Sequence, residues 1–274
     1  MKKFFLIAAL LMTMVLGSAR SFAAVEETRS YFPPILMYHD IKLFALNKFD
    51  VTIKDFVAQI KWLQKNNYQT LSMDEFVEIL ESGKKFPSNS ILITFDDGYL
   101  GAGTFAAREL RDRGMKATFF VNPDTLDQSL TKGYPHMTTE DVKALAATGL
   151  FSIESHTMSH PHLDKLSAED LKNELEQSKA AIEELTGHTV KALAYPFGDY
   201  DQKVIDAAIA AGYSTAFAVQ DRGLLDRAAR WSIPRIYMGL ELSGNNQKLF
   251  KKYVKSYKKM PPEMFAERWA PLNQ

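Results

Sequence analysis

Short apolar runs alternate with amphipathic helical segments along most of this 274-residue chain, and this order constrains the fold more than any other feature. The runs are continuous in apolar character and rich in β-branched and aromatic residues, as strands buried on both faces should be. They lie at 35–38, 91–95, 117–121, 151–154, 191–195 and 213–219. Alternation of this kind predicts a parallel sheet with helices outside, either open or closed into a barrel.

The helical segments between these runs carry recognisable start signals. Thr52 precedes an amphipathic stretch that extends to about Asn66. Three further starts place Ser or Thr three residues before an acidic residue, as in a capping box: Ser72 with Glu75, Thr138 with Asp141, and Ser167 with Asp170. The last of them opens the longest predicted helix, which Gly187 ends.

The first 23 residues are typical of an export signal peptide. Two lysines precede an apolar run at 4–16, and the segment ends in small residues at 21–23. The run is too short to cross a bilayer of roughly 30 Å, so it predicts cleavage and a periplasmic or secreted protein. The chain contains no Cys, which excludes disulfides, lipid attachment through Cys and thiolate metal sites.

Charge narrows the choice of partner. Cleavage after Ala23 removes Lys2, Lys3 and Arg20 but no acidic residue, which leaves 30 basic and 33 acidic residues. This slightly acidic balance offers no general attraction for nucleic acid, and a neutral polymer or small molecule is the more natural partner. About 250 residues remain, which suits one α/β domain, expected over 31–242 and acting as a monomer.

The tail at 243–274 differs from the rest of the chain. Apolar residues recur there at helical spacing, with lysines between them: Leu249, Phe250, Tyr253, Val254 and Tyr257. One interpretation is a basic helix that contacts an anionic membrane surface. The alternative is a terminal helix docked on the domain with its lysines in water.

Two short motifs carry chemistry. Asp96 and Asp97 follow the predicted strand at 91–95 in "TFDDG", and "HTMSHP" places His156 and His160 after the strand at 151–154. Because ligands gather where parallel strands end, these side chains are expected on one face. Imidazole and carboxylate suit zinc and its neighbours, and a spare carboxylate can take a proton from water. Taken singly, each motif could also be a turn or a structural histidine.

Together the motifs resemble those of the polysaccharide deacetylases of the NodB homology type, carbohydrate esterase family 4, over about 35–240. The resemblance implies a single-domain, distorted (β/α) barrel. It also implies that Asp97, His156 and His160 hold a divalent metal ion, zinc by ligand type with cobalt or nickel as alternatives, and that Asp96 is the general base. His162, in "HPH", is expected to be structural rather than a fourth ligand.

The third motif of this family normally begins with Arg, which orients the base. In "AYPFG" at 194–198, Ala194 stands at the Arg position, while Pro196 and Phe197 are retained. Arg235 is the candidate replacement from another strand end and Arg230 the second; an ordinary surface role for Arg235 is the alternative. By resemblance, the backbone N–H of Phe197 stabilises the oxyanion.

The family's last motif supplies a histidine near the C-terminus, but this chain has none beyond His188. His39, in "PILMYHDI", follows the first predicted strand. This arrangement resembles the circularly permuted branch typified by poly-N-acetylglucosamine deacetylases of biofilm exopolysaccharide systems, in which this early histidine is the general acid. A nearby carboxylate is expected to raise its pKa, with three candidates: Asp40, Asp221 and Asp226.

The sequence therefore predicts a secreted, metal-dependent enzyme that removes N-acetyl groups from an N-acetylglucosamine-containing polysaccharide, with poly-N-acetylglucosamine favoured. The alternatives are a peptidoglycan or chitin-oligomer deacetylase, or an inactive carbohydrate-binding relative. Five aromatic residues near predicted strand ends could stack on sugar rings or pack in the core: Tyr38, Tyr99, Tyr134, Tyr195 and Phe197.

Overall fold

The computed structural model describes residues 32–128, 134–219, 230–239 and 247–257. Its main feature is a curled, wholly parallel sheet with the strand order β10-β1-β5-β6-β7-β8-β9, to which β4 adds beside β5. The strands are β1 (Ile35–Tyr38), β4 (Gln69–Thr70), β5 (Ser90–Phe95), β6 (Ala117–Val121), β7 (Phe151–Ser155), β8 (Ala192–Ala194), β9 (Thr215–Phe217) and β10 (Ile236–Tyr237).

The sheet curls until its two edges meet. Ile233 bridges to Phe217 of β9, and three residues later Ile236 pairs with Leu36 of β1. The segment that leads into β10 therefore connects β9, at one end of the strand order, with β1, near the other end, and the predicted distorted α/β barrel is confirmed.

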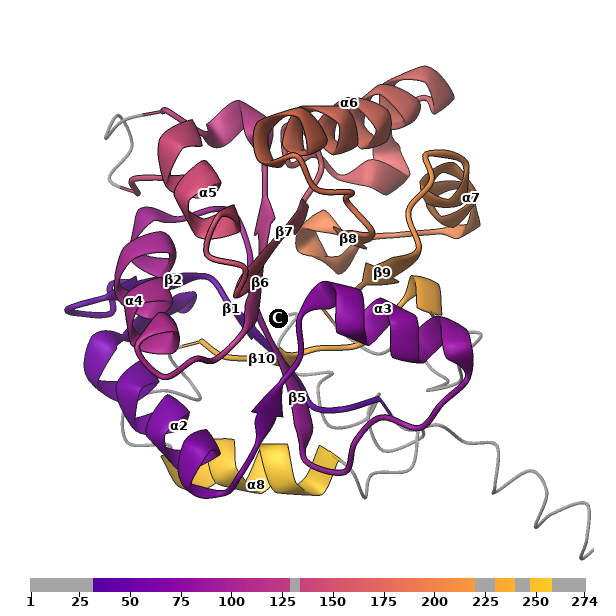
Figure 1. Ribbon diagram of the computed structural model, residues 1–274. Helices are drawn as coiled ribbons and strands as arrows, with labels where there is room; N and C mark the ends of the chain where they lie inside the picture. The colour runs from indigo at the N-terminus through magenta and orange to yellow at the C-terminus, as the bar shows by residue number, and fades with distance from the viewer. Residues whose placement is uncertain (1–31, 129–133, 220–229, 240–246, 258–274) are drawn as a thin grey trace, which may run out of the picture.

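Helices surround the barrel strands (Figure 1). They are α2 (Ile53–Lys65), α3 (Met73–Ser82), α4 (Ala107–Arg111), α5 (Thr139–Ala146), α6 (Ala168–Thr186), α7 (Gln202–Ala210) and α8 (Gln247–Tyr257). Single turns of other helix types lie at η1 (Ala102–Ala106), η2 (Pro123–Thr125), η3 (Leu163–Lys165) and η4 (Pro196–Gly198). A separate two-stranded sheet pairs β2 (Asp40–Lys42) with β3 (Asp50–Thr52).

The predicted helix starts form as their sequences indicate. The Thr52 side chain caps α2, and reciprocal capping boxes open α3 and α5. The Ser167 hydroxyl accepts the backbone N–H of Asp170 at the start of α6, and Gly187 ends that helix in the left-handed conformation with φ of 72°. These caps satisfy backbone donors that a helix end would otherwise leave unpaired.

The interior of the barrel is apolar and aromatic. Every residue of β1, β5 and β6 is buried, and the rings of Phe95 and Phe119 stack at 4.9 Å. Tyr38 and Tyr195 are fully buried with their hydroxyls bonded to Gln59 and Trp231, so these two aromatics pack in the core and are not placed to meet a sugar.

The helix α8 is docked against α2. Phe250 and Val254 are buried, and the Phe250 ring contacts that of Trp62 edge-on at 5.5 Å. The Lys255 ammonium lies 5.6 Å from the centre of the Trp62 ring, and Gln247 donates to the Asp55 carbonyl. The described part of the tail thus takes the docked alternative. The rest of the tail and the predicted signal peptide at 1–23 lie outside the described residues, among which no helix is long and apolar enough to cross a membrane.

Candidate active site

The candidate residues converge where the barrel strands end. Asp96 and Asp97 follow β5, His156 follows β7, and His39 follows β1. Parallel strands place these ends at one edge of the barrel, although their positions in the sequence are far apart. Arg235 precedes β10 and is 4 % exposed, with its side chain inside the barrel.

Three of these side chains form a cluster with a metal-like donor set. Nε2 of His156 and Nε2 of His160 each lie 3.3 Å from Oδ1 of Asp97, and all three ligand atoms are within 4.8 Å of one another. Asp97 Oδ1 is buried and has no hydrogen-bond donor among the described residues. One carboxylate oxygen and two imidazole nitrogens that face a common point fit a divalent cation.

The surrounding backbone orients these donors. Nδ1 of His156 lies 2.8 Å from the carbonyl oxygen of Ala194, which accepts a hydrogen bond from Nδ1–H and leaves Nε2 free to bind a metal. Asp97, Gly98 and His160 have φ values of 68°, 71° and 62°, a left-handed conformation that tight turns impose here. Burial alone raises the pKa of Asp97, but the neighbouring imidazoles of His156, His160 and His39 outweigh it and hold that pKa well below its usual range.

Asp96 forms a buried ion pair with Arg235. The guanidinium contacts both carboxylate oxygens at 2.7 Å, and it also donates to Thr94 Oγ1 and to the carbonyl of Ala218. Asp96 is 2 % exposed. Burial raises its pKa, but the charge and hydrogen bonds of Arg235 lower it more, so Asp96 stays ionised below its ordinary pKa.

The other candidate arginine lies elsewhere. Arg230 donates to the carbonyl of Ser214 and to Glu81 at the surface, not to Asp96. The side chain at position 194 is a methyl group, so only the carbonyl of this residue takes part in the site, through His156.

His39 sits in an aromatic setting. Its ring centre is 5.1 Å from that of Phe49 and 6.0 Å from that of Tyr237, and Nδ1 is buried without a hydrogen-bond partner among the described residues. The expectation of a raised pKa was wrong: burial lowers the pKa of His39 and outweighs the opposite effects of Asp97 and Asp96.

Of the three carboxylates expected beside His39, only Asp40 is among the described residues, and it does not supply that effect. Asp40 accepts the backbone N–H of Ile41 and pairs with Lys42, with Nζ at 3.2 Å. Asp221 and Asp226 lie outside the described residues. The cause is local: β2 pairs with β3, which carries Asp40 into a separate polar cluster with Asp50.

Phe197 occupies a strained turn beside the histidines. Its φ is 59° and that of Gly198 is 74°, while the N–H groups of Gly198 and Asp199 bind carbonyls within the turn. The Phe197 ring is 53 % exposed and contacts the ring of His160 at 4.6 Å. The structure thus brings the turn next to the candidate metal ligands.

Sequence reasoning missed several contributors near this site. Asp199 holds the Nδ1 of His162 at 2.9 Å, and the amide of Asn122 donates to the carbonyl of His156. Phe49 and Tyr237 flank His39. None of these lies in a metal-binding motif, so only the acidic or amide character of Asp199 and Asn122 close to predicted strand ends could have indicated them.

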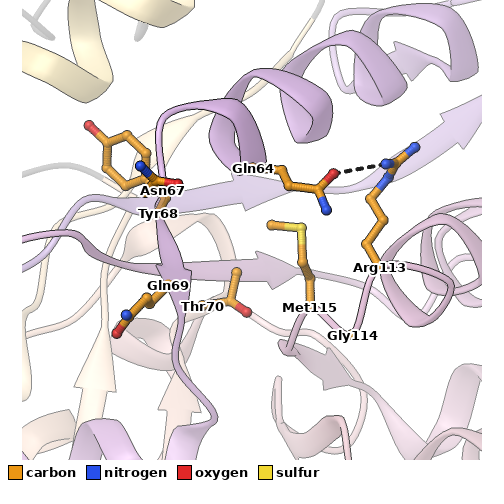
Figure 2. Close-up of a pocket in the computed structure, with 8 residues that line it drawn as sticks. All are labelled: Gln64, Asn67, Tyr68, Gln69, Thr70, Arg113, Gly114 and Met115. Atoms are coloured by element: carbon orange, nitrogen blue, oxygen red, sulfur yellow. Dashed lines mark hydrogen bonds between the residues drawn. The ribbon is translucent and has the colours of Figure 1, made fainter.

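A surface hollow at the opposite end of the barrel is separate from this site (Figure 2). It lies near the start of β5 and β6, and it is lined by Gln64, Asn67, Tyr68, Gln69, Thr70, Arg113, Gly114 and Met115. Arg113 donates to Gln64 across it at 2.9 Å. Its lining has no general base or metal-ligand set, so it offers no competing centre for chemistry.

Comparison with known proteins supports the architecture and the motifs together. Residues 83–216 match the family model described as "Polysaccharide deacetylase". The Bacillus subtilis protein YxkH, which is named as a polysaccharide deacetylase, is 33% identical over 225 residues. These cover 82% of this chain and 77% of YxkH. The poly-beta-1,6-N-acetyl-D-glucosamine N-deacetylase of Staphylococcus epidermidis is 26% identical over 199 residues, which cover 70% of this chain and 68% of the relative.

A solved structure shows the same fold. The deacetylase PplD of Streptococcus pyogenes superposes with a TM-score of 0.70 at 23% identity, covering 80% of this chain and 97% of PplD. The strand order, the position of the motifs and the similarity over most of YxkH agree with one another. This chain therefore belongs to the polysaccharide deacetylase family.

Proposed function

We propose that this chain is an exported, metal-dependent hydrolase that removes N-acetyl groups from an N-acetylglucosamine-containing polysaccharide, with poly-N-acetylglucosamine as the favoured substrate. The observation that carries the proposal is the buried Asp96–Arg235 pair adjoining the cluster of Asp97, His156 and His160. A binding protein has no need of an ionised carboxylate held beside a set of metal-type donors. The Staphylococcus epidermidis relative, by its name, supports the choice of polymer.

Asp97, His156 and His160 would hold the cation, with zinc first by ligand type and cobalt or nickel also acceptable. When bound there, a divalent ion would supply Lewis-acid chemistry, polarising the acetamide carbonyl and lowering the pKa of a water molecule. Asp97 remains an anionic ligand at neutral pH because its pKa is far below neutral. The Ala194 carbonyl fixes the tautomer of His156, as an outer partner of a metal ligand commonly does.

The remaining residues would move protons and stabilise charge. Asp96 accepts a proton from the attacking water, and Arg235 orients the Asp96 carboxylate through two hydrogen bonds. The Phe197 N–H, placed by Pro196 in the turn, donates to the oxyanion that forms on the carbonyl carbon. His39 protonates the departing amine, and the products are acetate and a glucosamine unit.

The lowered pKa of His39 has a consequence for this last step. A lower pKa makes the imidazolium a stronger proton donor toward the amine, but it also reduces the protonated fraction at neutral pH.

The proposal that the protein is exported rests on the sequence of residues 1–23. The proposal also takes the protein to act as a monomer.

The direct test is acetate release from defined poly-N-acetylglucosamine oligomers by purified protein. We expect release that stops with a chelator, returns with zinc and is lost in Asp96→Asn. The control is Asp112→Asn, whose side chain is 60% exposed in a surface ion pair. Substrate binding without any acetate release would instead identify a carbohydrate-binding relative, and faster release from peptidoglycan or chitin oligomers would change the substrate.

The role of His39 needs a separate variant. His39→Ala should lower kcat by about a hundredfold to ten-thousandfold, the usual contribution of a general acid, while metal content stays the same. Mass spectrometry of the native protein with zinc measures that content. Unchanged turnover would remove His39 from the mechanism.

A further inference from the structure

His162 and Asp199 form a contact that the metal cluster does not require. Nδ1 of His162 lies 2.9 Å from Oδ2 of Asp199, and the His162 ring stacks on Phe197 with centres 4.0 Å apart and planes 17° apart. One imidazole therefore touches the turn twice, through a hydrogen bond to Asp199 and through its face to Phe197. His162 is on the loop after β7 and the turn is on the loop after β8.

The turn needs external support. A non-glycine residue in the left-handed conformation costs about 1 kcal/mol, and Phe197 adopts it with φ of 59° directly before Gly198. A Cβ at position 198 would lie 2.8 Å from the side chain of Val219, so a larger residue does not fit in place of Gly198. The contacts of Phe197 with the two histidines are the described interactions that fix its side chain.

We propose that His162 and Asp199 are positioning residues that hold the Phe197 N–H at a fixed place relative to the metal ligands. The inference rests on the proposed function, in which this N–H meets the oxyanion. His160 and His162 flank the Phe197 ring from the same loop, one as a candidate ligand and the other as a brace. Through this brace, the loop after β7 that carries the candidate ligands fixes the position of the Phe197 N–H on the loop after β8.

The expected kinetic effect follows from the timing of the contact. An oxyanion donor acts in the transition state, so its displacement lowers kcat and leaves KM largely unchanged. A misplacement of about 1 Å can cost about a hundredfold in rate. We therefore expect His162→Ala and Asp199→Ala each to lower kcat tenfold to a hundredfold, with KM within twofold and the metal content unchanged.

Conservative variants separate bracing from simple stability. His162→Phe keeps the stacking and loses the hydrogen bond, so it should recover part of the rate that His162→Ala loses. The double variant His162→Ala/Asp199→Ala should lose no more than the worse single variant, because the two residues act through one contact. The matched control is His188→Ala, an exposed histidine beyond the end of α6 at the opposite end of the barrel, which should match wild type.

Hydrogen exchange measured by mass spectrometry gives a readout that does not depend on activity. Peptides that cover 195–200 should exchange faster in His162→Ala than in wild type and His188→Ala, at equal Tm. Unchanged exchange and unchanged kcat in His162→Ala, or effects that add in the double variant, would overturn the brace. A wild-type protein that releases no acetate would instead overturn the proposed function, while the exchange result still decides the brace.

Discussion

At the scale of single residues, the site uses the backbone of position 194 and the side chain of position 235. The Ala194 carbonyl orients His156, and the guanidinium that contacts Asp96 comes from Arg235, next to β10. Since a barrel closes on itself, a guanidinium beside this strand can reach a carboxylate that follows another strand. The contact with Asp96 therefore depends on where the guanidinium lies in space and not on which strand carries the arginine.

Replacement of Arg235 by Gln tests this pair. The folded-state pKa of Asp96 is lowered, so its carboxylate stabilises the fold above its unfolded pKa, and this contribution is lost as pH falls through the folded pKa. Arg235→Gln should raise that pKa, move the acidic limb of the pH profile of kcat/KM to higher pH, and lower the unfolding free energy by about 3 to 5 kcal/mol.

Denaturant unfolding and pH–rate profiles measure both effects, with Arg230→Gln as the surface control. An acidic limb that stays in place in Arg235→Gln would show that Arg235 does not set the charge of Asp96.

The motif residues could be predicted from sequence because each directly follows a strand that sequence also identifies. Asp97 and His156 are examples, since β5 and β7 have strong apolar signals. The surroundings of His39 could not be predicted, because they depend on Phe49 and on the pairing of β2 with β3. A pKa follows from burial and neighbours, and neither is visible in a short motif.

At the scale of elements, all six predicted apolar runs form strands, and the capped helices begin where expected. The strands missed by sequence reasoning were β2, β3, β4 and β10, which are two or three residues long. Hydrophobic periodicity can be recognised only over a longer window than this. The charged residues in β2 and β3 also favour a loop when each segment is considered alone. Their formation depends on tertiary pairing rather than on local propensity.

The buried Glu154 on β7 joins this strand to β8. One oxygen accepts the backbone N–H groups of Lys191 and Ala192, where β8 begins, at 2.8 and 2.7 Å. Burial raises the pKa of Glu154 to about 8, despite these donors. Because the folded pKa is above the unfolded one, its contribution is complete below the unfolded pKa and is lost as pH rises through about 8.

Glu154→Gln should remove this pH dependence. The amide oxygen keeps both backbone contacts and does not ionise, so the variant should lose less stability than wild type between pH 5 and 9. Urea unfolding across that range measures the difference, with exposed Glu140→Gln as the control. Parallel curves for wild type and Glu154→Gln would contradict the assignment.

The docking of α8 on α2 gives a second prediction at this scale. Phe250 is 1 % exposed against Trp62, so Phe250→Ala should lower the unfolding free energy by about 3 to 5 kcal/mol. Lys252→Ala, at an exposed position on the same helix, should change it by less than about 0.5 kcal/mol. Equal effects of the two variants would show that α8 is not docked in solution.

At the scale of the whole molecule, the barrel core lies apart from the candidate metal ligands, and we expect it to fold without a metal. The core runs through the sheet and the surrounding helices, while the candidate ligands lie at one end of the strands. A chelator should therefore leave the far-UV circular dichroism unchanged and lower Tm, and zinc at a hundred times its Kd should add about 2.7 kcal/mol. Loss of the folded spectrum on chelation would contradict a core that is independent of the metal.

The meeting of β1 with β10 also has a temporal consequence. His39 is among the first described residues and Arg235 is close to the last strand, yet both belong to one centre. A nascent chain that has emerged from the ribosome only as far as β9 contains the histidine and both aspartates without their arginine. The Asp96–Arg235 pair can therefore form only after synthesis has passed β9, and a product terminated at β9 should leave Asp96 without this guanidinium.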